Sequence, residues 1–294
     1  MHRLTYIIVY PFIYGLASLP FPLLYLLSDF LCLLMYDIFG YRKKVVRKNL
    51  ILVFPEKGKK WYKTIERKFY HHMCDIMLET IKSFKISEEE IKKRFKIKNI
   101  EALKQFEDKD RSVIVMCGHY ASWEWMMSLG YHLKHKGYGI YTPLINEYFD
   151  RLVKRIRKRH NAYVISRYEA LETIRNHNKN NERGIYGFAS DQSPQPKPKS
   201  YWRKFLGVKV PVFLGAELLA RELDLAIVFA EINRVKRGYY EAEFKVLTEN
   251  PKATKPNEIT DLFTDWVEAQ VYNDPSQYLW SHNRFKHNHL APKD

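Results

Sequence analysis

A long apolar run at the amino terminus sets the first constraint on how this chain folds. Residues 4–39 read LTYIIVYPFIYGLASLPFPLLYLLSDFLCLLMYDIF, and Asp29 and Asp37 are the only formal charges among them. A helix that crosses a bilayer needs about 20 mostly apolar residues. The run therefore has room for one span together with an interfacial segment.

Three prolines argue against one straight helix through the whole run: Pro11, Pro20 and Pro22. A cleaved signal peptide fits poorly, because the apolar region is too long and no small-x-small cleavage site closes it. A buried helical hairpin of a soluble core is the other alternative. We predict that residues 1–40 form a membrane anchor, either one spanning helix or an interfacial hairpin.

Basic residues crowd the segment directly after the apolar run, which reads YRKKVVRKNL: Arg42, Lys43, Lys44, Arg47 and Lys48. On the other side of the run only Arg3 and the amino terminus are positive. The positive-inside bias then predicts that the body of the protein lies on the cytoplasmic face of the membrane. The cluster would also attract anionic headgroups, by about 1 kcal/mol per Lys or Arg, although a solvated basic helix face is the simpler alternative.

Composition removes several classes of protein. The chain has 294 residues with 49 Lys and Arg against 33 Asp and Glu, a formal charge of +16, so an acidic partner is expected. Aromatic residues make up 15%, which excludes a disordered chain, and three scattered cysteines exclude a disulfide scaffold. A mean hydropathy of −0.42 is too low for a polytopic membrane protein.

Short apolar runs alternate with helical patterns through the rest of the chain. Runs that suit strands lie at 112–116, 139–141, 163–165, 185–189 and 225–230, and 239–247 alternates like an edge strand or hairpin arm. Helical patterns lie at 123–133, 148–159, 170–176 and 213–221. This alternation predicts an α/β fold, with a central, largely parallel or mixed sheet flanked by helices. We expect residues 41–294 to form one catalytic domain.

The segment SVIVMCGHYASWEWMM places a histidine directly after a buried strand. Positions five apart on a helix point about 140° away from each other, so His119 can meet Glu124 only from the loop before the helix. Gly118 before the histidine and Ser122 as a helix cap would supply that geometry. Glu124 could then accept one ring N–H and leave the other nitrogen as a base that activates a hydroxyl for attack on an acyl carbonyl.

The spacing of histidine and acid is not specific by itself, since it occurs three times: His119/Glu124, His177/Glu182 and His289/Asp294. His177 lies in a polar loop and the third pair lies in the tail. Only His119 follows a strand at its carboxyl end, where α/β sheets place their sites. A packing histidine remains the alternative on spacing alone.

Several blocks in order resemble the lipid A late acyltransferases of bacteria, which transfer secondary lauroyl or myristoyl chains. The blocks are HYASWEW, YTPLINEYFDRLVKRIRKRH, GFASDQSP and PSQYLWSHNRFK, and the apolar start followed by YRKKVVRKNLILVFPE is also similar. The resemblance covers nearly the whole chain and implies a glycerol-3-phosphate acyltransferase-like fold. It implies His119 as general base and Glu124 as its partner. The acyl chain would pass without a covalent acyl-enzyme, usually from acyl carrier protein, to a hydroxyl of a lipid A precursor.

The second block departs from the family pattern, because Thr142 stands where the family usually has Arg. Arg167 matches a later basic position and could bind phosphate in its place, since its planar fork suits that group. Asp191 and Gln192 follow a strand, at the same kind of sheet edge as His119, and could position the acceptor; a turn aspartate is the alternative reading of Asp191. Three further candidates for phosphate contacts could equally be solvated: Lys197, Lys199 and Arg203.

Other chemistries leave no signature in the chain. No Cys/His spacing predicts a zinc site, and no Gly-rich phosphate loop or GxSxG elbow occurs. We therefore expect no metal and no cofactor, with acyl-ACP or acyl-CoA as co-substrate. Cys117 reads as inert core, and Trp280 and Arg284 as packing and surface.

Alternative functions have less support. A lysophospholipid or glycerolipid acyltransferase usually has His-x4-Asp and a later Glu-Gly-Thr-Arg element, which is not found here. A nucleic-acid-binding protein would explain the charge but not the apolar run, and a non-enzymatic membrane scaffold would require His119 to be a packing residue. The expected partners are thus an anionic membrane lipid as acceptor, acyl carrier protein or a coenzyme A thioester, and the membrane surface, with no nucleic acid.

Overall fold

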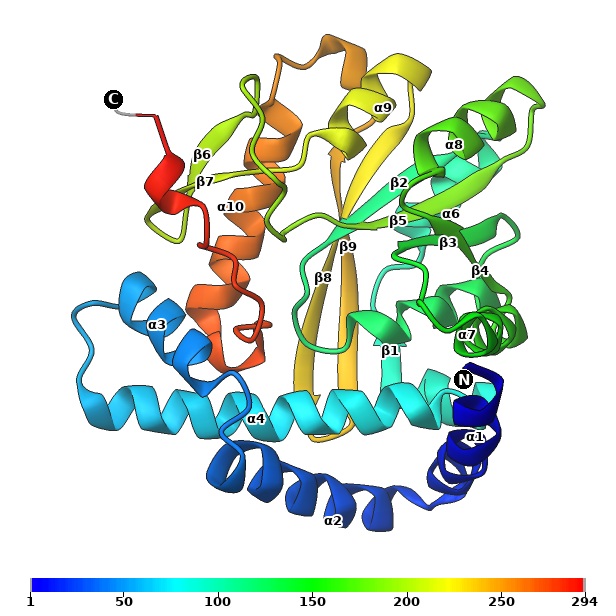
Figure 1. Cartoon of the computed structure of the whole chain (residues 1–294). Helices are drawn as coiled ribbons and strands as arrows, with labels where there is room; N and C mark the ends of the chain where they lie inside the picture. Colours follow the sequence, from blue (N-terminus) through cyan, green and yellow to red (C-terminus); the bar gives the residue numbers. More distant parts are fainter. Residues whose placement is uncertain (1, 293–294) are drawn as a thin grey trace.

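The computed structural model describes residues 2–292 and has one central sheet with helices on both sides (Figure 1). The sheet has seven strands in the order β1-β9-β8-β2-β5-β3-β4. All neighbouring pairs are parallel except β8 and β9, which form an antiparallel hairpin. This confirms the predicted α/β class.

Six strands of the central sheet lie close to the predicted positions, and three further strands, at 95–97, 202–205 and 208–211, match no predicted run. The strands are β1 (Phe95–Ile97), β2 (Val113–Cys117), β3 (Lys136–Tyr141), β4 (Ala162–Ser166), β5 (Gly184–Ala189), β8 (Ala226–Lys236) and β9 (Tyr239–Thr248), with a separate antiparallel pair β6 (Trp202–Phe205) and β7 (Val208–Pro211). The central strand β2 is buried at every position, as expected for a strand that neighbouring strands and helices cover.

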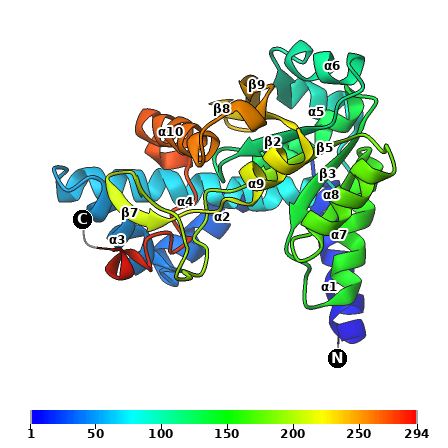
Figure 2. The same ribbon diagram turned by 90° about the horizontal axis from the view of Figure 1, so that it is seen from above.

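The α-helices are α1 (His2–Ser18), α2 (Phe21–Cys32), α3 (Lys43–Val53), α4 (Lys59–Lys82), α5 (Glu88–Arg94), α6 (Glu101–Asp108), α7 (Glu147–Arg159), α8 (Ala170–Lys179), α9 (Gly215–Leu223) and α10 (Glu258–Asn273). Shorter helical turns are η1 (Leu33–Ile38, a π-helix), and the 3₁₀ helices η2 (Trp123–Tyr131), η3 (Pro251–Ala253), η4 (Pro275–Gln277) and η5 (Asn288–Leu290). In the view from above, α7 and α8 lie at one end of the sheet and α3 and α10 toward the other (Figure 2).

One expected α-helix takes a tighter form. The segment predicted at 123–133 is the 3₁₀ helix η2, and the Ser122 side chain makes no capping hydrogen bond to it. Trp125 and Ser128 are both fully buried. A 3₁₀ helix brings residues three apart onto one side, so this form buries both and lets the Trp125 indole donate to Ser83 at 3.2 Å.

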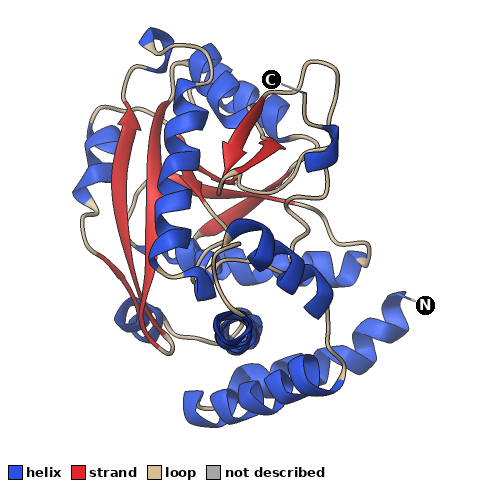
Figure 3. Cartoon of the chain, turned by 90° about the vertical axis from the view of Figure 1, so that its left-hand side faces the viewer, coloured by secondary structure: helices blue, strands red, loops and turns tan. Residues whose placement is uncertain are grey.

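The apolar amino terminus is not one straight helix, as predicted, but it breaks only before Pro20, and Pro11 lies inside α1. Helix α1 ends at Ser18, α2 begins after Pro20, and η1 continues it. Within the described residues, Phe21–Ile38 is the one helical stretch long and apolar enough to cross a membrane by length and composition, with a mean hydropathy of 1.6 and 28% of it buried. These helices form a layer below the sheet-containing body (Figure 3).

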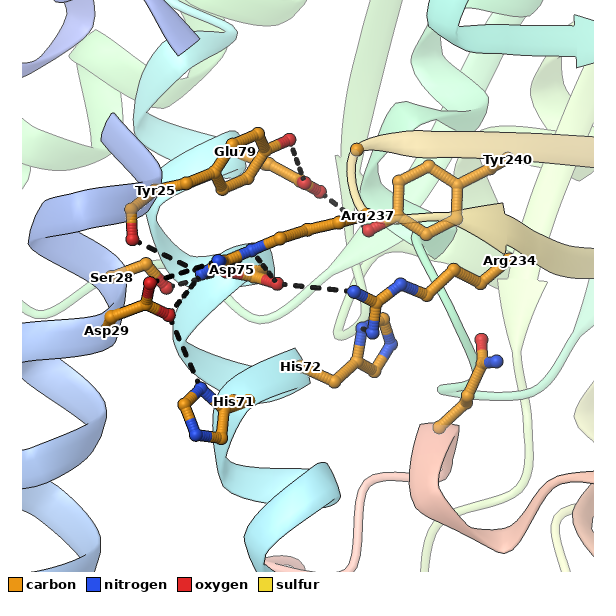
Figure 4. A network of polar contacts seen from close by, with 12 residues as sticks. Tyr25, Ser28, Asp29, His71, His72, Asp75, Glu79, Arg234, Arg237 and Tyr240 are labelled. Atoms are coloured by element: carbon orange, nitrogen blue, oxygen red, sulfur yellow. Dashed lines mark hydrogen bonds and ion pairs between the residues drawn. The ribbon is translucent and has the colours of Figure 1, made fainter. Parts of the chain in front are cut away.

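The inner face of α2 packs against α4 through polar contacts as well as apolar ones. Tyr25 donates to Glu79 at 2.8 Å, and Ser28 donates to Asp75 at 2.7 Å. Arg237, in the β8–β9 turn, bridges Asp29 and Asp75 (Figure 4). The predicted anchor is therefore tied to the body of the protein by hydrogen bonds and ion pairs.

Some side chains of the basic cluster after the apolar run form ion pairs and hydrogen bonds within the protein. Arg47 forms a bidentate ion pair with the buried carboxylate of Glu66, and Arg42 donates to the Ser281 carbonyl at 2.9 Å. Lys44 and Lys48 are exposed. Only part of the predicted headgroup-binding surface is thus free to face a membrane.

Candidate active site

The pairing of two central strands brings a histidine and an aspartate together. Strands β2 and β5 run parallel, with Cys117 opposite Ala189. His119 is the second residue after β2, and Asp191 is the second residue after β5. The side chains therefore meet at the carboxyl edge of the sheet, the usual place for sites in α/β proteins.

The contacts of the imidazole fix its tautomer. His119 Nδ1 lies 2.6 Å from Asp191 Oδ1, so Nδ1–H donates to the carboxylate. The Gln192 side-chain amide donates to Nε2 at 3.1 Å, which leaves Nε2 as the unprotonated nitrogen. The Trp123 ring packs edge-on against the imidazole, with centroids 5.2 Å apart. This arrangement presents Nε2 as a hydrogen-bond acceptor, as a general base requires.

The charges around His119 stabilise the protonated form of its imidazole. Burial lowers the pKa of His119, but the charge and hydrogen bond of Asp191, together with the charge of Glu124, outweigh it and raise the pKa above its ordinary value. Burial raises the pKa of Asp191, but the charge and hydrogen bonds of His119 outweigh that and lower it. Asp191 therefore stays ionised and stabilises the imidazolium.

The expected contact between His119 and Glu124 does not form. In the described structure the Glu124 carboxylate instead accepts from Arg157 of α7 at 2.6 Å, and His119 pairs with Asp191. The physical reason is the geometry of the segment: η2 begins at Trp123 without a Ser122 cap, and the β2–β5 register already supplies a carboxylate to the ring. Glu124 acts on His119 through its charge and not through a hydrogen bond.

An apolar cavity of about 640 Å³ opens beside the imidazole and passes between the sheet and η2. His119, Glu124 and Arg157 line it together with Trp123 and Gln192. Its further walls are mostly apolar or lack a side chain, and include Met126, Met127, Leu133, Gly137, Gly139, Ile140, Leu171, Phe188 and Phe213. A long aliphatic chain fits this composition.

Arg167 lies at this cavity with Thr142. The two residues follow the paired strands β4 and β3, in which Ser166 is opposite Tyr141. Arg167 is exposed, its main-chain N–H donates to Tyr141, and its guanidinium lies 5.1 Å from the Tyr168 ring centroid. Arg167 and Thr142 thus lie at the ends of two paired strands, and a phosphate-binding role for Arg167 in place of the family's usual Arg stays a prediction.

The other predicted basic candidates lie elsewhere. Arg203 is held by Asp261 and Asp265 on α10. Lys197 and Lys199 do not line the cavity among the described residues. The structure thus gathers Arg157 and Arg167 at the site and leaves these three outside it.

Two contributors were not singled out from the sequence. Arg157 lies on α7, within the helical pattern predicted at 148–159, and Trp123 begins the segment predicted as a helix at 123–133. The closing segment also supports the site, because Leu279 N–H donates to the His119 carbonyl at 3.1 Å.

Trp280 and Arg284 are both buried, so the assignment of Arg284 to the surface is wrong. Cys117 is buried, as expected for core, and burial raises the pKa of its thiol to about 12.

Comparison with known proteins places this arrangement in a family. The chain matches the family model described as "Bacterial lipid A biosynthesis acyltransferase" over residues 2–287. It is 24% identical over 281 residues to the lipid A biosynthesis palmitoleoyltransferase of Escherichia coli (strain K12), covering 92% of this chain and 87% of that protein. It is 22% identical over 274 residues to the lipid A biosynthesis lauroyltransferase of the same strain, with the same coverage. The chain therefore belongs to the bacterial lipid A biosynthesis acyltransferase family and is an acyltransferase.

Proposed function

We propose that this enzyme transfers a fatty acyl chain from a thioester donor, acyl carrier protein or coenzyme A, to a hydroxyl of a lipid A precursor. The observation that carries the proposal is the His119–Asp191 pair, in which His119 lines an apolar cavity. The family membership supports the lipid acceptor. The exposed Arg167 at the same cavity suits a phosphate on that acceptor.

The proposed reaction needs no covalent acyl-enzyme. Nε2 of His119 removes the proton from the acceptor hydroxyl as its oxygen attacks the thioester carbonyl. When the tetrahedral intermediate collapses, the C–S bond breaks and the imidazolium returns the proton to the leaving thiolate. Asp191 positions the ring and stabilises its charged form. Arg157, which Glu124 holds and which lines the same cavity, would stabilise the carbonyl oxygen as negative charge develops.

The amino-terminal layer is proposed to hold the enzyme at the cytoplasmic face of the inner membrane. The outward stripe of α2 and the start of η1 carries Leu23, Leu26, Phe30 and Leu33, all exposed. Because the opposite stripe is hydrogen-bonded to α4, a helix lying in the membrane interface keeps contacts that a spanning helix would break.

Mass spectrometry of lipids from cells that lack the protein tests the acceptor. We expect lipid A that lacks one secondary acyl chain, restored by the wild-type gene. Altered glycerophospholipids with unchanged lipid A would contradict the proposal and indicate a glycerolipid acyltransferase.

Narrowing the cavity should change the preferred acyl chain. A Cβ added at Gly137 meets no atom within 4 Å, so the Gly137→Leu side chain would enter cavity space without disturbing the strand. We expect the variant to prefer donors shorter by a few methylenes, because each excluded CH₂ costs about 0.8 kcal/mol. Rates with a series of saturated acyl donors check this, with Gly137→Ala as the graded control. An unchanged chain-length profile would show that the acyl chain lies elsewhere.

A further inference from the structure

A second concave surface lies apart from the apolar cavity. We call it the basic groove: a cleft of about 810 Å³ between the first half of α4, the β8–β9 turn and the 274–277 loop. Its lining residues are Lys60, Lys63, Thr64, Arg67, Lys68, His71, Asp75, Arg234, Val235, Lys236, Arg237, Asp274, Ser276 and Gln277. It shares no residue with the described lining of the His119 cavity.

The basic groove carries a strong excess of positive charge. Seven of its lining residues are Lys or Arg and two are Asp, and Asp29 and Asp37 beside the groove pair with Arg237 and Arg67, which leaves a formal charge of +3 without His71. Both lining aspartates are already engaged: Asp75 with Arg237 and Arg234, and Asp274 with the 276–277 segment. An excess of this size in a concave site favours an anionic ligand.

Three lysines are available to such a ligand. Lys60, Lys63 and Lys68 are exposed on α4, and no carboxylate in the described chain forms an ion pair with any of them. The opposite wall is rigid, because Arg237 is fixed by Asp29 and Asp75 (Figure 4). The groove therefore combines a wall held by ion pairs with exposed ammonium groups on α4.

The groove also borders the apolar amino-terminal layer. Arg67 contacts Asp37 at 3.1 Å, His71 contacts Asp29 at 3.4 Å, and both aspartates belong to the α2–η1 segment. The outward side of that segment is the exposed apolar stripe already described. If this stripe lies in a membrane, the cations beside it lie at the level of the lipid headgroups.

We propose that the basic groove binds the phosphate of an anionic lipid headgroup, as a second lipid site separate from the His119 cavity. This inference rests on the membrane location in the proposed function but not on the acyl-transfer reaction. Phosphate is the anion that a bilayer presents at this depth, and Arg and Lys are its usual protein partners. The groove is linked to the active-site loop, since Ala121 N–H donates to the Gln277 carbonyl at 3.2 Å.

Vesicle flotation of the full-length protein tests the site. The probes are neutral phosphatidylcholine vesicles and the same vesicles with one fifth phosphatidylglycerol. The variant is Lys60→Gln/Lys63→Gln/Lys68→Gln, and the charge-matched control changes three exposed lysines away from the groove, Lys104→Gln/Lys179→Gln/Lys252→Gln. Thermal unfolding of each protein checks that it is folded.

Wild type should bind the anionic vesicles more tightly than the neutral ones. The groove variant should lose on the order of 100-fold of that preference, at about fivefold per lysine, and the control should keep most of it. Equal losses in both variants would overturn the proposal in favour of general surface charge. His119→Ala should bind both vesicles as wild type does, so a failure of the reaction is told apart from a failure of the groove.

Two further arms identify the source of the anion. If inorganic phosphate at matched ionic strength raises the thermal midpoint of wild type but not of the groove variant, while vesicle preference is absent, the groove takes free phosphate and the lipid assignment is wrong. If the groove variant keeps its vesicle preference but loses activity only with carrier-protein donors, the groove is a protein-docking site and the proposal is overturned.

Discussion

His119→Ala should lower kcat/KM for thioester-dependent acylation by about 10²–10⁴-fold, the usual contribution of a positioned general base. The loss should appear in kcat, because the apolar cavity that would hold the acyl chain is unchanged by the substitution. The measurement is acyl transfer to a lipid A precursor by the purified, detergent-solubilised variant, with donor in excess.

The matched control is His289→Ala, which removes an exposed imidazole from another of the three His-x4-acid pairs. It should retain full activity. A folded His119→Ala enzyme with undiminished turnover would remove the imidazole from the mechanism.

Asp191→Asn should cause the second large loss, also about 10²–10⁴-fold, since a neutral amide neither fixes the Nδ1–H tautomer nor stabilises the imidazolium. Asparagine is nearly isosteric with aspartate, so the buried site keeps its packing. Turnover at saturating donor measures the loss, and thermal unfolding confirms the fold.

The pH dependence separates this role from a structural one. Asp191 raises the pKa of His119, so wild-type activity should fall on acidification through a pKa above 6.5. Removing the negative charge lowers that pKa, and the acid limb of the Asp191→Asn profile should move to lower pH. Glu124→Gln should move it less, because that carboxylate is bonded to Arg157. A larger shift for Glu124→Gln than for Asp191→Asn would reverse the two roles.

The sheet and the position of the histidine could be predicted from local pattern. The run at 112–116 is apolar and β-branched at successive positions, and strand β2 occupies 113–117. A buried strand followed by Gly118 and His119 already places the imidazole at a sheet edge. These features depend on residues adjacent in the sequence, which is why sequence reasoning reached them.

The partner of the histidine could not be predicted in the same way. Glu124 is close in sequence, whereas Asp191 is brought to the ring by the pairing of β2 with β5, a contact across a long stretch of chain. The sequence of either strand alone does not determine the register in which two parallel strands pair. The 3₁₀ form of η2 likewise depends on what Trp125 packs against, and not on local propensity.

The tertiary contacts of the amino-terminal segment could not be predicted from its sequence either. Its hydropathy predicted membrane contact, but not that Asp29 would pair with Arg237 of the β8–β9 turn. A charged side chain inside an apolar run can destabilise a helix in a bilayer, or it can form an ion pair with the body of the protein. Only the tertiary structure distinguishes the two.

The most direct test of the central claim is the protonation of the His119 ring, read by ¹⁵N NMR of histidine-labelled enzyme above the acid limb. We predict a protonated Nδ1 and an unprotonated Nε2, with the Nδ1 proton signal absent in His119→Ala and shifted in Asp191→Asn. A ring protonated at Nε2, or an Nδ1 proton signal that moves in Glu124→Gln and not in Asp191→Asn, would contradict the account.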